Sequence, residues 1–313
     1  MKTPESLLEA TRLFSNPRAA HDYLAKLRWP DGVIPCPRCG SNEDHLFLEN
    51  QLRWKCRHCK MQFSVKVGTI FEDSPLGLDK WLIATWLIVN AKNGISSCEI
   101  ARSLEVTQKT AWFVLHRIRL ALQEGTFEKF GGSGSEVEVD ETYIGAKARN
   151  MHFDKKPGYR GMVGKQIVMG FLERGGKVRT IHISQTNRKA MEAAVNDHVE
   201  HGTDLYTDAH GSYRFMSQWY KHQVIDHAQS YVQDRVHTNG LENYWSLLKR
   251  AIGGTYVSVE PFHLHRYMDE QAFRYNERKG SDADRFLLAL LGTPGRRLTF
   301  AELTGKLLPA AGA

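Results

Sequence analysis

The chain has 313 residues, of which 42% are hydrophobic and 25% charged, as is usual for a globular protein of about two domains. No apolar run approaches the roughly 20 residues of a membrane-spanning helix, and no signal peptide is visible, so we expect a cytoplasmic protein with no membrane partner. The formal net charge of +7 suits a polyanionic partner such as nucleic acid, although many basic proteins bind no DNA.

Four of the five cysteines form two closely spaced pairs, CPRCG and CRHCK. Their CxxC spacing is typical of a four-thiolate zinc site, in which each short turn brings two sulfurs to one ion. A redox dithiol is the alternative, but it requires only one such pair. We therefore predict an N-terminal helix and a zinc ribbon within residues 1–70, with a closed, structural Zn²⁺ site formed by Cys36, Cys39, Cys56 and Cys59.

Residues 71–130 read as three helices joined by short turns. Ser96 or Ser97 can cap the second helix, with Glu99 near its third position, and Thr107 can cap the third. This is the pattern of a helix-turn-helix whose last helix enters the major groove, and an ordinary three-helix bundle is the alternative. The absence of Asp and Glu between residues 107 and 121 favours DNA binding.

The predicted DNA contacts follow from their places on that third helix. The first side chains of a recognition helix usually meet base edges, and later basic residues suit phosphates. The candidates for base contacts are Gln108, Lys109 and Thr110, and those for phosphate contacts are Arg117 and Arg119.

GGSGS, residues 131–135, has the composition of a flexible linker. In the following EVEVDETYIG, alternation places Glu136, Glu138 and Asp140 on one face of a strand. The segments after it read as a hairpin, a helix, a strand ending at Asp208 and a further helix, which is the order of a ribonuclease-H-like layout. We predict this α/β catalytic domain over residues 136–280, followed by a C-terminal tail, residues 281–313, without assigned chemistry.

In a ribonuclease-H-like layout, carboxylates come from the first strand, the end of the fourth strand and a late helix. Asp140, Asp208 and Glu242 occupy these places, and a pair of Mg²⁺ ions holding the oxygens of a phosphoryl transfer needs such hard ligands. Each acid also has an ordinary explanation. Asp140 can be an exposed strand residue, with Glu138 and Glu141 competing for its role. Asp208 can cap a following helix, with Asp204 as a weaker rival.

The segment HTNGLENYWSLLKR allows two interpretations. Asn239 and Glu242 have the spacing of an N-cap and its reciprocal Glu. Glu242 and Lys249 are two helical turns apart and share a face, so they can instead belong to one active site. No cap requires Lys249, so this residue favours the active-site interpretation.

Several motifs together resemble one known family, over roughly residues 20–278. These motifs are CPRCG with CRHCK, FSVKVGTIFEDSPLGLDKW, VEVDETYIG, YTDAHGSY, HTNGLENYWSLLKRAIGGTY and HRYMDEQAFRYNER. The chain resembles bacterial insertion-sequence transposases of the DDE superfamily, in the ISXO2-like branch with a zinc ribbon and helix-turn-helix before the catalytic domain. The expected fold is therefore multidomain α+β, with an N-terminal zinc ribbon and helix-turn-helix and a ribonuclease-H-like α/β catalytic domain.

The resemblance implies that Asp140 and Asp208 hold catalytic Mg²⁺ or Mn²⁺. Members of the branch differ at the third position, so both Glu242 and Asn239 are candidates, and the carboxylate of Glu242 is favoured. Lys249 is then expected to contact a phosphate near the scissile bond. The implied partners are double-stranded DNA, as element ends and as target, and further copies of the chain in a nucleoid-associated homo-oligomer.

Three other functions fit parts of the sequence. A ribonuclease-H-like nuclease would cut without transferring strands, and the DNA-binding N-terminus argues against it. A DNA-binding regulator would need only the ribbon and helix-turn-helix, which leaves the three acids unexplained. A catalytically inactive, domesticated transposase would bind DNA without cutting it, and the intact acid set argues against that function.

Overall fold

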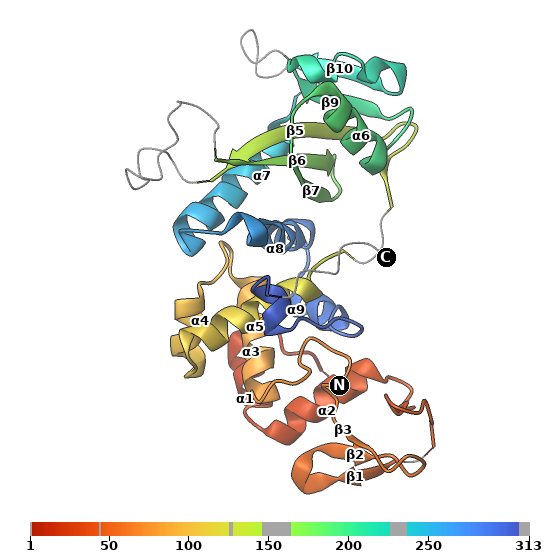
Figure 1. Cartoon of the computed structure of the whole chain (residues 1–313), viewed down its shortest axis with the longest axis vertical. Helices are drawn as coiled ribbons and strands as arrows, with labels where there is room; N and C mark the ends of the chain where they lie inside the picture. The colour runs from red at the N-terminus through yellow and green to blue at the C-terminus, as the bar shows by residue number, and fades with distance from the viewer. Residues whose placement is uncertain (1, 44, 125–127, 146–163, 226–236, 307–313) are drawn as a thin grey trace. The chain divides into compact units, whose positions relative to one another are not determined.

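The computed structural model describes residues 2–43, 45–124, 128–145, 164–225 and 237–306 (Figure 1). The chain forms two compact units. The first comprises Met1–Gln123 and Glu277–Ala313, and the second comprises Glu124–Asn276. Within the described ranges, no helix combines the length and the apolar character needed to cross a bilayer.

The first unit contains most of the described helices, and two of them start at caps that the sequence predicts. Ser96 and Glu99 form a reciprocal capping box at α4, and the Thr107 side chain caps α5. The hydroxyl or carboxylate oxygens of these caps accept hydrogen bonds from otherwise unpaired N–H groups of the first turn. The helices of this unit are α1 (Leu7–Phe14), α2 (Pro17–Arg28), α3 (Leu78–Asn90), α4 (Ser97–Leu104), α5 (Gln108–Ala121), α9 (Asp282–Leu291) and α10 (Phe300–Leu303).

A small antiparallel sheet lies between α2 and α3 in the chain. Its strands are β1 (Leu46–Leu48), β2 (Arg53–Lys55) and β3 (Gln62–Phe63), paired in that order. The Trp54 ring stacks on Phe63 at 5.9 Å between ring centroids, which supplies an apolar core to strands too short to be stable alone. β1 and β2 form a hairpin between the two cysteine pairs, and β3 follows the second pair.

The C-terminal residues do not form the separate tail that we predicted. Helix α9 packs against α3, and the fully buried Phe286 contacts the rings of Trp86 and Phe14. The apolar face of ADRFLLALL therefore completes the core of the first unit. The sequence shows this face, but periodicity does not say which distant helix will cover it.

The second unit is built on a five-stranded mixed sheet with the order β10-β9-β5-β6-β7. β5 is antiparallel to β6 and parallel to β9, and β9 is parallel to β10. The strands are β5 (Glu136–Ile144), β6 (Gln166–Glu173), β7 (Val178–Ile183), β9 (Asp204–Asp208) and β10 (Lys221–Ile225). The remaining elements are β4 (Phe130–Gly131), β8 (Val199–Glu200), α6 (Arg188–His198), α7 (Asn239–Arg250), the π-helical continuation Ala251–Tyr256 and α8 (Leu264–Asn276).

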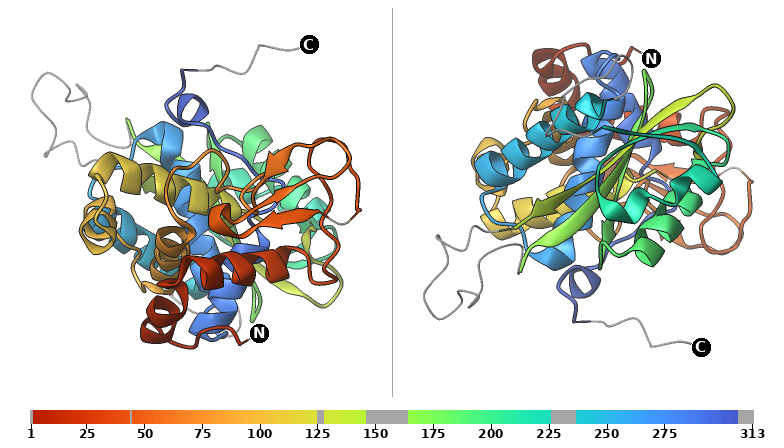
Figure 2. Two further views of the ribbon diagram at one scale, coloured as in Figure 1. Left: turned by 90° about the horizontal axis from the view of Figure 1, so that it is seen from below. Right: turned by 90° about the horizontal axis from the view of Figure 1, so that it is seen from above.

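Helices cover both faces of this sheet (Figure 2). On one face, Val137 and Val139 of β5 pack with Met191 and Val195 of α6. The other face packs against α7 and α8, through residues that include Val168, Leu172, Leu241, Trp245 and Met268. Alternation along β5 therefore directs Glu138 and Asp140 toward the α7 side, as the sequence predicts.

The stretch GGSGS is not the flexible linker that we predicted. Gly131 belongs to β4, which pairs with β8, and the Gly132 N–H donates to Thr203 Oγ1 at 2.9 Å. The Ser135 carbonyl oxygen accepts from the Asp204 N–H at 3.1 Å. Composition alone indicated flexibility, but these long-range hydrogen bonds make the segment part of the second unit.

Candidate functional site

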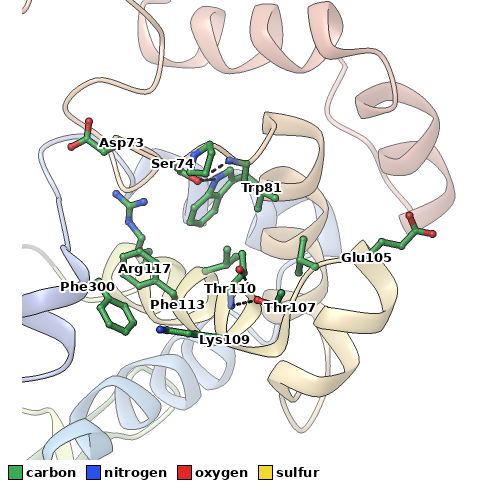
Figure 3. A pocket seen from close by; sticks show the side chains of 14 residues that line it. Asp73, Ser74, Trp81, Glu105, Thr107, Lys109, Thr110, Phe113, Arg117 and Phe300 are labelled. Carbon is green, nitrogen blue, oxygen red and sulfur yellow. Dashed lines mark hydrogen bonds between the residues drawn. The ribbon is translucent and has the colours of Figure 1, made fainter.

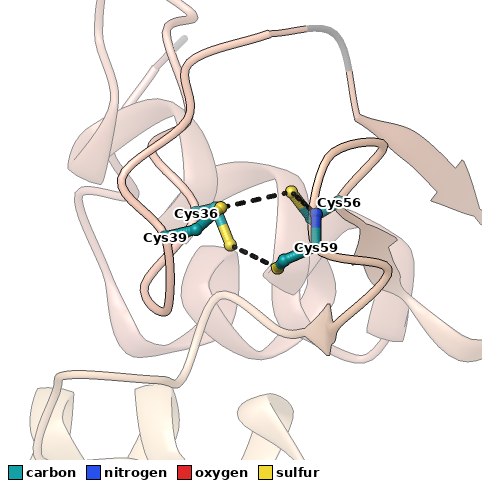
Figure 4. A group of neighbouring side chains, drawn as sticks. All are labelled: Cys36, Cys39, Cys56 and Cys59. Atoms are coloured by element: carbon teal, nitrogen blue, oxygen red, sulfur yellow. Dashed lines mark hydrogen bonds between the residues drawn. The ribbon is translucent and has the colours of Figure 1, made fainter.

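The two cysteine pairs adopt the same turn and face each other (Figure 4). In each turn the first cysteine carbonyl oxygen accepts from the N–H four residues later, that of Gly40 or Lys60. The Sγ atoms of Cys36 and Cys59 are 3.6 Å apart, and those of Cys39 and Cys56 are 3.7 Å apart. A tetrahedron with Zn–S bonds of about 2.3 Å has edges of about 3.8 Å, so the four sulfurs fit Zn²⁺.

Asp140 and Asp208 lie on adjacent parallel strands, each two residues beyond the last pair of the ladder between those strands. β5 pairs with β9 from Glu136 opposite Asp204 to Glu138 opposite Tyr206. Continuing that register by two residues places Asp208 beside Asp140. Because facing residues of in-register strands point to the same side of a sheet, both carboxylates are directed to the α7 side. Both residues are partly exposed.

The carboxyl groups at this edge repel one another. Burial raises the pKa of Asp140 to about 7, and the charges of Glu141 and Asp208 add to the rise, while a hydrogen bond from Trp245 opposes it. Burial also raises the pKa of Glu141, against the effect of its hydrogen bond from Tyr213. A bound divalent cation relieves such repulsion, so this donor set fits Mg²⁺ or Mn²⁺.

Helix α7 contributes the third set of candidate residues, but the predicted cap is wrong. Thr238 precedes the helix at the N-cap position, without a side-chain cap bond, and Asn239 is already the first helical residue. Glu242 and Lys249 are both exposed and lie about 20° apart around the helix axis, two turns from each other. Trp245 lies between them in sequence and donates from its indole Nε1 to Asp140 Oδ2 at 2.8 Å. The helix face that carries Glu242 and Lys249 therefore lies next to Trp245, which contacts Asp140.

The three predicted carboxylates do not converge closely with their side chains as they stand. Among the described residues, one group of at least three His, Cys, Asp or Glu side chains has all its ligand atoms within 4.8 Å of one another, and it is the cysteine cluster. The structure thus places Asp140 and Asp208 together and leaves Glu242 on the adjoining helix. A metal ion shared by the three carboxylates therefore requires their side chains to rotate from these positions.

The two competing acids of β5 have other partners. Glu138 is buried and accepts from Arg174 Nε at 3.1 Å and from the Leu241 N–H of α7 at 3.0 Å. Glu141 points to the opposite face and accepts from the Tyr213 hydroxyl at 2.7 Å. Sequence reasoning did not foresee these partners, because they come from segments far away in the chain.

The candidate base-contacting residues occupy the first turn of α5, beside a pocket (Figure 3). Gln108 and Lys109 are exposed, whereas Thr110 is half-buried with its hydroxyl 2.9 Å from that of Thr107. The Lys109 ammonium group lies 4.8 Å from the centre of the Phe300 ring of α10. Gln108 and Lys109 are thus the accessible members of this set.

The expectation that Arg117 and Arg119 contact phosphates conflicts with the structure, because both side chains are buried. Arg117 donates to the Glu72 carbonyl oxygen at 2.5 Å and lies over the ring of Phe113. Three-dimensional packing decides which faces of α5 are buried, and a count of basic residues does not show that these two lie on buried faces.

A mixed sheet with aspartates on its first and fourth long strands is consistent with the ribonuclease-H-like layout predicted from the sequence. Residues 131–276 match the family model of the ISXO2-like transposase domain, and residues 15–62 match that of the transposase zinc-ribbon domain. The chain belongs to the ISXO2-like transposases with an N-terminal zinc ribbon and a DDE-type catalytic domain.

A curated relative supports this assignment. The chain is 25% identical over 254 residues to an uncharacterized protein in the transposable element ISH50 of Halobacterium salinarum. The aligned region covers 76% of this chain and 84% of the relative.

Proposed function

We propose that this protein is a DNA transposase that binds the terminal repeats of an insertion sequence and catalyses metal-dependent strand cleavage and strand transfer. The observation that carries the proposal is the placement of Asp140 and Asp208 side by side on adjacent strands of an ISXO2-like domain. Besides burial, the charge of Asp208 raises the pKa of Asp140, so negative charge is concentrated here, as a cation site requires.

We assign the third ligand to Glu242 and the phosphate contact to Lys249. Glu242 offers a carboxylate, which binds Mg²⁺ better than the amide of Asn239. Its stripe on α7 also carries Lys249, so an ammonium group lies two turns from the carboxylate. When bound, the divalent ions supply charge neutralisation and orientation to the phosphoryl transfer. The Lys249 ammonium adds a positive charge to hold the phosphate.

The first unit supplies the proposed DNA-binding surface. α4 and α5 have the lengths and the short connection of a helix-turn-helix, and the exposed start of α5 offers Gln108 and Lys109 to a groove. Transposition acts on two element ends, which supports a homo-oligomer working on chromosomal DNA in the nucleoid.

Removing the charge of Lys109 should weaken DNA binding without unfolding the protein. The ammonium group is exposed, so we expect Lys109→Ala to weaken affinity several-fold and to reduce the slope of log affinity against log salt by about 1. Arg117→Ala should instead lower the melting temperature, because it removes a buried guanidinium with its bond to Glu72. Fluorescence anisotropy over a salt series, with thermal unfolding of both variants, checks this contrast. If Lys109→Ala kept the wild-type slope and Arg117→Ala reduced it, Arg117 rather than Lys109 would be the residue that contacts DNA.

A DNA-binding protein without nuclease activity is the second candidate, favoured by the lack of close convergence among the three carboxylates. A cleavage and strand-joining assay with Mg²⁺ or Mn²⁺ on an element end decides between the two. We expect wild-type protein to cut and join, Asp208→Ala and Glu242→Gln to bind the end without cutting, and Asn239→Ala to retain cutting. Cleavage by Asp208→Ala at the wild-type rate would exclude the proposed site.

A further inference from the structure

Two hydrogen bonds join β5 to α7, and their spacing along the strand matches their spacing along the helix. Glu138 accepts from the Leu241 N–H at 3.0 Å, and Asp140 accepts from the Trp245 indole at 2.8 Å. The strand residues are two apart, about 6.6 Å, and the helix residues are four apart, about 6 Å. The two bonds therefore hold the helix alongside the strand in one register.

The Trp245 indole reaches Asp140 across a glycine. Gly170 pairs with Asp140 in the ladder between β5 and β6. A Cβ atom at Gly170 would lie 2.6 Å from Trp245 Cζ2 and 2.9 Å from Leu241 Cδ2, closer than such atoms can approach. The backbone of β6 is thus left bare where the ring crosses it, and the buried indole is directed at a single carboxylate oxygen.

The start of α7 is held by a second close approach. A Cβ at Gly240 would lie 2.7 Å from Glu138 Oε2, so the glycine leaves space for this carboxylate at the helix backbone. Arg174 pairs with Glu138 and donates to the His237 carbonyl oxygen at 2.8 Å, which ties the backbone two residues before the helix to β5. Glu242 lies one residue beyond Leu241, where this attachment fixes its position.

We propose that Trp245 is a positioning residue for metal binding: its N–H holds Oδ2 of Asp140 and orients the carboxylate toward Asp208 and Glu242. This inference rests on the proposed function, because it concerns the same carboxylate site. Removing a residue that orients a metal ligand typically weakens metal affinity by about 10- to 100-fold. Trp245→Phe keeps most of the ring and removes the donor.

The test measures Mn²⁺ binding to the zinc-loaded full chain, using the electron paramagnetic resonance signal of free Mn²⁺. We expect Trp245→Phe to bind Mn²⁺ about 10-fold more weakly than wild type. Trp219→Phe makes the same substitution at an exposed position and should leave the affinity unchanged. Leu248→Val loosens the same helix without touching Asp140, so it should lower the melting temperature and preserve the affinity.

The outcomes separate this inference from the proposed function. If Asp140→Asn loses Mn²⁺ and Trp245→Phe retains wild-type affinity, the positioning role is excluded and the metal site stands. If wild type and Asp140→Asn bind Mn²⁺ equally, the metal site itself is excluded. Equal losses of affinity in Trp245→Phe and Leu248→Val would show that Trp245 acts only through packing.

Discussion

Replacing Asp140 with asparagine is expected to stabilise the metal-free protein at pH 8 while abolishing strand cleavage. Burial raises the pKa of Asp140 to about 7, so the folded state binds this proton more tightly than the unfolded state, where an aspartate titrates near pH 4. The free energy of unfolding therefore falls as the pH rises from about 4 to about 7. The neutral amide avoids this loss, and its oxygen can still accept from Trp245.

The expected gain in the free energy of unfolding at pH 8 is on the order of 2–4 kcal/mol, and it should vanish below about pH 4. Cleavage should fall by on the order of 10³-fold or more. Urea unfolding between pH 5.5 and pH 8, with zinc bound and no added Mg²⁺ or Mn²⁺, checks the first effect, because the gain should shrink as the pH falls. Asp204→Asn, at the other end of β9, is the matched control and should keep cleavage. An Asp140→Asn protein that is less stable than wild type at pH 8 would contradict the electrostatic account.

Removal of zinc is expected to unfold the ribbon. The three strands β1, β2 and β3 are two or three residues long; the first cysteine turn precedes β1, and the second joins β2 to β3. In isolated zinc fingers, metal binding is worth about 10–16 kcal/mol, far more than a core of this size supplies. Chelation should therefore abolish hydrogen-exchange protection of the three strands.

The cysteine variants sharpen this test. Cys56→Ala removes a buried thiol of the cluster and should yield a protein without zinc and without protected ribbon strands. Cys98→Ala removes the exposed cysteine outside the cluster and should keep one zinc per chain. Zinc content by mass spectrometry, measured with hydrogen exchange, gives both readouts. A zinc-free ribbon with full exchange protection would overturn the structural role of the metal.

Local patterns predicted the parts of the fold that depend on local chemistry. The cysteine spacing, the Ser96 and Thr107 caps, the alternation around Asp140 and the strand end at Asp208 are all found in the structure. Each depends on a few neighbouring residues, so periodicity and spacing carry the information. Asp208 precedes short 3₁₀ turns rather than the predicted helix, a difference of hydrogen-bond pattern that composition does not encode.

The features that the sequence did not reveal are long-range. Arg174 and Trp245 act through partners that are 36 and 105 positions away. Burial of Arg117 and the pairing of GGSGS depend equally on segments distant in the chain. One local signal pointed to the contact between β5 and α7. Gly240 lies in the first turn of a helix, where glycine is unfavourable unless another group packs closely against the backbone.

Iron-directed cleavage of the protein tests the shared metal site most directly. Fe²⁺ can replace Mg²⁺ at carboxylate ligands, and with ascorbate and peroxide it cuts the backbone beside the site that it occupies. The proposed site predicts cuts near Asp140, Asp208 and Glu242 in the same sample, suppressed by excess Mg²⁺ and absent in Asp208→Ala. Cuts that omit the α7 segment, or that persist in Asp208→Ala, would contradict a metal site shared by these three residues.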